Sequence, residues 1–211
     1  MLVIHHLGVS QSERIIWLCE ELGLPYELVR YERDAETRLA PAEYKALHPF
    51  GTAPVLDDGA LRMGESGAIV EYLIQTYGEG RLAVPPGALH YAEYLYWWHF
   101  ANASLVPAAL MDGVVRRLGA SDPVSRSLGT RINLAYDMME VRLGKVDYFA
   151  GDQFTAADIL MFFPLTTMRS FSGRDITTFP SIAAYLRRVG DRAAYRRAMA
   201  KADPHMTLML S

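Results

Sequence analysis

A short turn near the amino terminus carries hydroxyl groups that could stabilise an anion. Ser10, Gln11 and Ser12 lie between an apolar strand pattern and a helical pattern. A serine hydroxyl cannot serve as the base, but it can donate a hydrogen bond to a charged group, which is worth roughly 1.5–3 kcal/mol. The positive end of the following helix would add to that stabilisation. Alternatively, these serines only cap the helix, a role that suits Ser12 better than Ser10.

Two other residue pairs could hold a polar ligand. Ala53-Pro54 precedes a short strand, and a cis bond there would fix Ala53 in an extended geometry. An ordinary trans proline at the first position of a strand is the alternative. Glu65-Ser66 opens a helical pattern, so a carboxylate, a hydroxyl and unpaired helical N–H groups would meet there. An ordinary helix start with an acidic first turn is the alternative.

Other reactive residue types have simpler explanations. His5 and His6 are neighbours in a strand, so they face opposite sides and cannot share one ion; we expect no metal site. Cys19 lies on the apolar stripe of a helix and is expected to be a buried structural thiol. The absence of a C-x-x-C motif disfavours a dithiol oxidoreductase. Thr155 and Asp158 have the spacing of a capping box, which predicts a structural role for Asp158.

Composition narrows the classes of protein. The 211 residues are 51% hydrophobic and 21% charged, with a formal net charge of −3, which leaves nucleic acid an unexpected partner. A single cysteine excludes internal disulfides and thiolate zinc clusters, and it fits a reducing, cytoplasmic compartment. No basic-flanked leader is evident, and no apolar run approaches the roughly 20 residues of a membrane span, so we expect no membrane partner.

The elements that would position these residues are strands and helices in the first part of the chain, and helices alone in the rest. Apolar spacing predicts the order β-α-β-(α)-β-β-α over the first 78 residues, with a hairpin around Asp57-Asp58-Gly59. The segment 79–87 is rich in glycine and proline and is predicted to be a linker. Beyond it, helices are expected near 88–117, 124–144, 155–169 and 180–200.

Five segments, in order, resemble the cytosolic, bacterial-type glutathione S-transferase family with a serine-type active site. They are Ser10 to Arg14, Trp17 to Tyr26, His48 to Leu56, Glu65 to Ile69 and Gly151 to Asp158. The resemblance covers nearly the whole chain. It implies a thioredoxin-like βαβ-ββα domain at 1–78, a linker at 79–87 and an all-helical domain at 88–211 with a hydrophobic electrophile site.

The resemblance also implies a use for the polar residues, with glutathione as co-substrate. Ser10 would donate a hydrogen bond to the glutathione thiolate and lower the thiol pKa by roughly one to two units. Histidines stand where some relatives use tyrosine. The implied glutathione ligands are Gln11, the backbone of Ala53 beside a cis Pro54, Glu65, Ser66 and His48, with Lys45 as a further candidate. Thr52 stands where several relatives have lysine, so the grip on the glycine carboxylate is expected to be weak.

The electrophile is expected to meet the first long helix of the second domain. Its aromatic residues recur at helical spacing, and most are expected to belong to the core. The candidates for the electrophile site are Trp97, Asn102 and Met111. Phe50 could anchor a homodimer, which the resemblance implies, or fill its own core.

The implied activity is addition of the glutathione thiolate to hydrophobic electrophiles, as in detoxification. Glutathione-dependent peroxide reduction, dehalogenation and isomerisation would use the same thiolate. A non-catalytic carrier of apolar ligands is the competing class, although such a carrier would not need Ser10, Pro54, Glu65 and Ser66 together.

Overall fold

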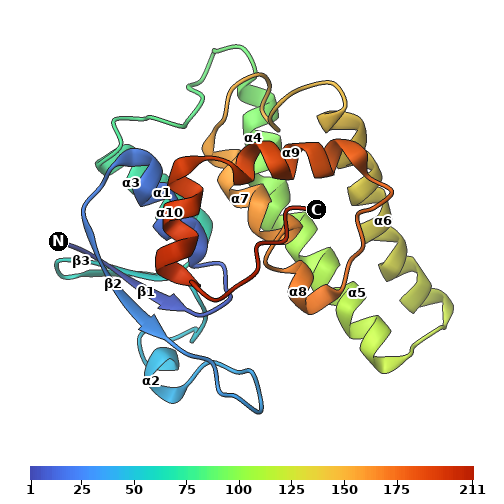
Figure 1. Cartoon of the computed structure of the whole chain (residues 1–211), viewed down its shortest axis with the longest axis horizontal. Helices are drawn as coiled ribbons and strands as arrows, with labels where there is room; N and C mark the ends of the chain where they lie inside the picture. The colour runs from blue at the N-terminus through green and yellow to red at the C-terminus, as the bar shows by residue number, and fades with distance from the viewer. The chain divides into compact units, whose positions relative to one another are not determined.

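A computed structural model describes all 211 residues, which form two compact units (Figure 1). The first unit holds residues 1–82 and 191–207, and the second holds residues 83–190 and 208–211. The domain limits expected from the sequence, 1–78, 79–87 and 88–211, remain a prediction. The structure adds that the segment 191–207 packs with the first unit.

The first unit is built on a four-stranded mixed sheet in the order β2-β1-β3-β4. β1 runs parallel to β2 and antiparallel to β3, and β4 closes a hairpin on β3. The strands are β1 (Leu2–Leu7), β2 (Tyr26–Tyr31), β3 (Val55–Asp58) and β4 (Leu61–Met63). The predicted order of elements in this part of the chain is confirmed.

Helices α1 (Glu13–Leu22), α3 (Ser66–Thr76) and α10 (Ala193–Ala202) form the helical layer of this unit. α1 contributes its apolar stripe, including the fully buried Cys19, and ends at Gly23, whose φ of 67° is left-handed. α10 lies against α1 in Figure 1, and the rings of Trp17 and Tyr195 meet edge to face at 5.0 Å. The short helix α2 (Ala42–Lys45) places Tyr44 in an apolar cluster with Leu7 and Val55.

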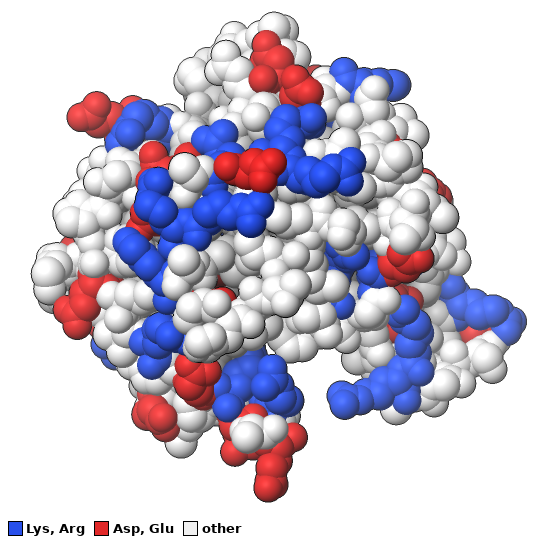
Figure 2. All heavy atoms as spheres, in the orientation of Figure 1, with Lys and Arg blue, Asp and Glu red and all other residues white.

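Ion pairs fix α10 to α1. Arg192 donates to both carboxylate oxygens of Glu21 at 2.7 and 2.8 Å, and Arg197 donates to Glu20 at 2.8 Å. On the face drawn in Figure 2, acidic side chains lie among the basic ones. Arg192 and Arg197 are therefore structural partners of α1.

The second unit is helical throughout. It comprises α4 (Tyr91–Phe100), a π-helical turn η1 (Ala101–Leu105), α5 (Val106–Leu118), α6 (Pro123–Leu143), α7 (Ala156–Leu165), α8 (Arg169–Ser172) and α9 (Pro180–Gly190). Every residue of α7 is buried, and the predicted capping box of Thr155 and Asp158 begins it. None of the helices in either unit combines the length and apolar composition that a bilayer crossing requires.

Two predicted helices are interrupted. The helix expected near 88–117 widens into η1 just before Pro107, which has no N–H to donate to the preceding turn. The helix expected near 180–200 is two helices, α9 and α10, because the chain turns extended at Arg192, with φ −62° and ψ 128°. The turn matters because it sends α10 into the first unit.

Candidate active site

The hydroxyl turn lies between β1 and α1, with both serines buried. Ser12 occupies the N-cap position of α1, yet its hydroxyl makes no capping bond, so the predicted capping role is wrong. Its Oγ instead lies 2.8 Å from Nδ1 of His6 and accepts the N–H of Leu7 at 3.2 Å. The Oγ of Ser10 lies 2.7 Å from the Oγ of Ser12 and accepts the Ser12 N–H at 3.3 Å. The turn therefore joins two serines and a histidine.

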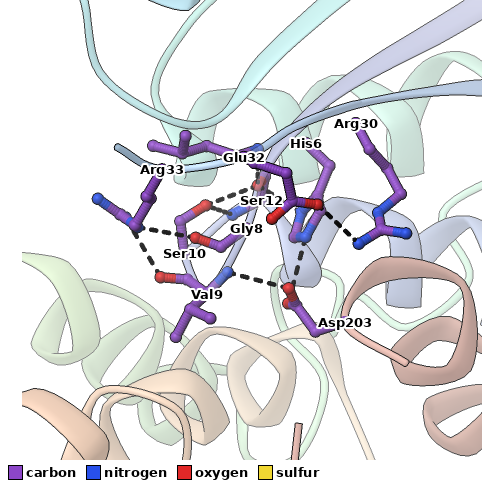
Figure 3. A network of polar contacts seen from close by, with 10 residues as sticks. His6, Gly8, Val9, Ser10, Ser12, Arg30, Glu32, Arg33 and Asp203 are labelled. Atoms are coloured by element: carbon purple, nitrogen blue, oxygen red, sulfur yellow. Dashed lines mark hydrogen bonds and ion pairs between the residues drawn. The ribbon is translucent and has the colours of Figure 1, made fainter. Parts of the chain in front are cut away.

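A carboxylate completes this chain of contacts, as Figure 3 shows. Oδ2 of Asp203, just after α10, lies 3.2 Å from Nε2 of the fully buried His6. Oδ1 of Asp203 accepts the Val9 N–H at 3.1 Å. Burial tends to raise the pKa of Asp203, but the bonds from His6 and Val9 outweigh it, and the pKa lies below its usual value. A buried chain of hydrogen bonds thus runs from Asp203 through His6 and Ser12 to Ser10.

The backbone of the turn is strained and is held from both sides. Val9 has a φ of 52°, a left-handed conformation that is costly for a β-branched residue. Its N–H is bound by Asp203, and its carbonyl accepts a bond from Arg33 at 3.2 Å. Arg33 also donates to the carbonyl of Gly8 at 2.8 Å. Backbone strain of this kind is typical of residues at active sites and ligand-binding sites.

The start of α3 meets the same turn. The Oγ of Ser66 accepts a bond from Arg14 at 3.0 Å, and Arg14 donates to Oε1 of Gln11 at 2.6 Å. Burial lowers the pKa of Arg14 to about 9. Gln11 and Ser66, far apart in the sequence, therefore lie together around a buried guanidinium. The exposed Glu65 has a φ of 65°, a second strained residue beside them.

The loop before β3 supplies the remaining candidates. The Ala53-Pro54 bond is cis, which confirms that prediction. His48 packs against Gly64, since a Cβ on that glycine would lie 3.3 Å from the imidazole ring, and it therefore neighbours Glu65. Nδ1 of His48 accepts the backbone N–H of Phe50, whose side chain is 71% exposed. Phe50 therefore does not fill its own core.

Other predicted roles are decided by burial. Cys19 is fully buried, which confirms a structural thiol, and burial raises its pKa to about 12. His5 and His6 point to opposite faces of β1, and His5 pairs with Asp57 at 3.0 Å. The pKa of Asp57 falls to about 2, chiefly through its bond with Arg62. No group of three or more metal-ligating side chains is present.

The three candidates for the electrophile site lie in different surroundings. Trp97 is buried, with its ring 4.7 Å from that of Phe149, so its assignment stays a prediction that burial argues against. Asn102 lies half-buried in the π-helical turn. Met111 borders a groove of about 380 Å³ within the second unit. The groove is lined mainly by side chains of α4, α5 and α6, among them Tyr96, Phe100, Pro107, Leu134 and Met138.

The residues that sequence reasoning missed are His6, Asp203, Arg14 and Arg33 as parts of the site. His6 was considered as a metal ligand and as a residue that stands where some relatives use tyrosine, and Arg14 only as part of a motif. Asp203 carries no local signal at all, because it lies 197 residues from His6. Arg33 was not among the candidate residues. Only the packing of α10 and β2 beside the turn brings these groups together.

Comparison with known proteins gives consistent results over the whole chain. Residues 5–81 match the description "Glutathione S-transferase, N-terminal domain", and residues 100–192 match "Glutathione S-transferase, C-terminal domain". Glutathione S-transferase 3 of Schizosaccharomyces pombe is 33% identical, covering 100% of this chain and 92% of that protein. Glutathione S-transferase GstB of Escherichia coli is 28% identical, covering 90% and 93%. A crystal structure of a glutathione S-transferase from Actinobacillus pleuropneumoniae is 33% identical with a TM-score of 0.89, covering 100% and 99%.

Proposed function

Because the chain belongs to the glutathione S-transferase family, we propose that it transfers glutathione to hydrophobic electrophiles through a serine-type site. The single observation that carries the proposal is the contact of Gln11, next to Ser10 in the hydroxyl turn, with Ser66 at the start of α3. A helix start favours anions, and glutathione brings a thiolate and two carboxylates.

The chemical task is to keep a thiol ionised near neutral pH, since a free thiol has a pKa of about 8.5. A hydrogen bond from Ser10 to the sulfur would stabilise the thiolate relative to the thiol. The nearby amino end of α1 acts in the same direction. The thiolate then attacks the electrophile, for which Asn102 and Met111 are the candidate contacts in the second unit.

The γ-glutamyl end of glutathione carries an ammonium and a carboxylate. Glu65 would accept hydrogen bonds from the ammonium, and the Ser66 hydroxyl with the first N–H groups of α3 would hold the carboxylate. Arg14 supports this end, because it contacts both Ser66 and Gln11. The backbone of Ala53 would pair with the cysteinyl unit as an added strand does. His48, with Lys45, is the candidate for the glycine carboxylate.

Replacing Glu65 by glutamine is expected to weaken glutathione binding by about tenfold, since a hydrogen bond to a charged group is lost while a neutral acceptor remains. Isothermal titration with glutathione measures the change. Glu71→Gln, on the same helix and also exposed, is the matched control and should bind as the wild type does. Equal affinity of the two variants would remove Glu65 from the site.

Turnover of chlorodinitrobenzene with glutathione tests the function itself. A protein that binds glutathione but turns over no electrophile would be a carrier, the competing class. Activity on a peroxide, a halogenated substrate or an isomerisable one in place of conjugation would redirect the same thiolate to another reaction. A protein that does not bind glutathione would contradict the whole proposal.

We also propose that the protein is a cytoplasmic homodimer anchored by Phe50. The aromatic ring is exposed and apolar, and the groove at Tyr96, Phe100 and Met138 is a concave apolar surface on the second unit. In a two-fold dimer, Phe50 of each subunit would enter the groove of the other subunit. The same contact would therefore be made twice. The buried Cys19 needs no oxidising compartment, which supports the cytoplasm.

The Phe50→Ala variant is expected to raise the dimer dissociation constant by some thirtyfold or more. Full burial of an aromatic ring stabilises a complex by roughly 1.5–3 kcal/mol, partial burial by less, and the variant loses this contribution from two rings. Analytical ultracentrifugation over a concentration series measures it. Leu39→Ala, another exposed apolar residue of the first unit, is the control and should leave association unchanged. A wild-type monomer, or a variant that associates as tightly as the wild type, would contradict the proposal.

A further inference from the structure

We propose that His6, backed by Asp203, takes up the proton of the bound glutathione thiol through the hydroxyls of Ser12 and Ser10. The inference rests on the proposed function, because it requires the thiol to lie beside Ser10. It adds a destination for the proton, which the hydroxyl of Ser10 alone does not provide.

The direction of each hydrogen bond follows from the buried carboxylate. Asp203 can only accept, so Nε2 of His6 carries the hydrogen in their 3.2 Å contact. In the neutral imidazole Nδ1 is then an acceptor, and Ser12 must donate its only hydroxyl hydrogen to it over 2.8 Å. In the 2.7 Å contact between the serines, Ser10 is therefore the donor.

This direction has a consequence for the sulfur. While His6 is neutral, the hydrogen of Ser10 points to Ser12, and a lone pair of the Ser10 oxygen is what an incoming thiol meets. Ser10 can then accept a hydrogen bond from the thiol but cannot donate one to a thiolate. Ionisation of the thiol has to reverse the direction of the whole chain of hydroxyls.

The reversal is a balanced proton transfer. The thiol S–H bond breaks, its electron pair stays on sulfur, and its proton joins the Ser10 oxygen. The former Ser10 hydrogen moves to the Ser12 oxygen, and the former Ser12 hydrogen moves to Nδ1 of His6. The result is a thiolate that accepts a hydrogen bond from Ser10, and an imidazolium whose charge is balanced by Asp203 at the other ring nitrogen.

The surroundings of His6 suit an imidazolium that forms when the thiol ionises. The imidazole is fully buried, and its two ring nitrogens contact only Asp203 and Ser12 among the hydrogen-bonding groups. The other charged residues on the elements around His6 are Glu27 and Arg30 on β2, Glu32, Arg33 and Asp34 after it, Glu13, Arg14, Glu20 and Glu21 on α1, Asp57 and Asp58 on β3, and Arg196, Arg197 and Lys201 on α10. Arg30 is paired with Glu32 at 3.1 Å, and Arg33 is bound to backbone carbonyls of the turn.

The neighbouring strand residue offers a matched comparison. His5 also pairs with an aspartate, Asp57, at 3.0 Å, but its other nitrogen contacts the phenol of Tyr31 and reaches no serine. The two dyads therefore share residue types and strand, and differ in their link to Ser10. His6 and Asp203 are positioning residues in this scheme, since they act on the sulfur only through the two hydroxyls.

The experiment compares the number of protons released to the buffer with the amount of thiolate formed when glutathione binds. Glutathione is titrated into the protein at about pH 7.5, below the pKa of a free thiol. Two buffers that differ in ionisation enthalpy are used, and the difference in heat gives the protons released. Ultraviolet absorbance of the same complex gives the thiolate formed. S-methylglutathione, which has no thiol, gives the protons that the rest of the ligand releases, and that number is subtracted.

We expect fewer than about half a proton released per thiolate in the wild type, and about one in His6→Gln, whose amide can bond to both neighbours but cannot hold the proton. Asp203→Asn should move the ionisation midpoint of the bound thiol upward by about one pH unit or more, through loss of the opposite charge. His5→Gln should match the wild type. Should His6→Gln fail to fold, the wild-type count and Asp203→Asn still decide the matter.

A count near one proton per thiolate in the wild type would overturn the relay while leaving the transferase function intact. A midpoint unchanged in Asp203→Asn would also overturn it. A wild-type protein that binds glutathione without forming thiolate would instead contradict the proposed function, so the two failures can be told apart.

Discussion

The Ser10→Ala variant is expected to lose about tenfold to a hundredfold in kcat/KM for glutathione conjugation at neutral pH, because removing a hydrogen bond to the thiolate costs roughly 1.5–3 kcal/mol. The pKa of the bound thiol should rise by about one to two units for the same reason. The deficit should therefore shrink as the pH rises past the thiol pKa, where the thiolate forms without help. A pH profile of kcat/KM, with the absorbance of bound thiolate, measures both effects.

Two comparisons make the result specific to the hydroxyl. Glutathione affinity should stay within a few fold of the wild type, because Glu65 and Ser66 hold the other end of the ligand. Ser127→Ala, at an exposed position on α6, should leave every parameter unchanged. If Ser10→Ala kept both the thiol pKa and kcat/KM of the wild type, the thiolate would have another source of stabilisation, and the proton relay through Ser10 would fall with it.

The sequence predicts the parts of this site that depend on local chain geometry. The strand before the hydroxyl turn and the helix after it follow from apolar spacing, because a strand and a helix place their buried residues at different periods. Glu65 and Ser66 were predicted at a helix start, and α3 begins at Ser66. The cis bond at Pro54 came from the resemblance, since no local pattern distinguishes the two isomers.

The missing parts depend on contacts between distant segments. Ser12 was predicted to cap α1, because the N-cap position favours serine, but His6 and the Leu7 N–H compete for the same hydroxyl and win. Asp203 reaches His6 only because the chain turns at Arg192 and returns α10 to the first unit. Periodicity describes which side of an element is buried, and it contains no information on which polar groups meet there.

Strain is a second feature that spacing cannot indicate. Val9 and Glu65 both adopt left-handed backbone conformations, and neither residue type favours them. In a sequence these positions are indistinguishable from ordinary turn and helix-start residues. The structure explains Val9 through the bonds from Asp203 and Arg33 to its backbone. The π-helical turn differs, since Pro107 was visible and its missing N–H could have predicted the interruption.

The Asp158→Ala variant is expected to destabilise the protein by about 4 kcal/mol, the sum of a lost helix cap and buried donors left without an acceptor. The carboxylate accepts the N–H of Phe149 and of Thr155, both at 2.9 Å, the Thr155 hydroxyl at 3.2 Å and the Tyr185 hydroxyl at 3.1 Å. Burial raises the pKa of Asp158 to about 6 against these bonds. The carboxylate is therefore still mainly ionised at neutral pH, where all four donors need it.

A fall in melting temperature of roughly 10 °C would correspond to that loss in a chain of this size. Asp122→Ala is the matched control, because Asp122 also caps a helix, accepting from Val124 and Ser125 at the start of α6, but is exposed. Water can replace an exposed acceptor, so the control should lose only about 1 kcal/mol. Asp158→Asn should remain close to the alanine variant, because an amide turns two hydrogens toward groups that are themselves donors. Equal losses at Asp158 and Asp122 would mean that capping alone explains the effect and that burial of the carboxylate adds nothing.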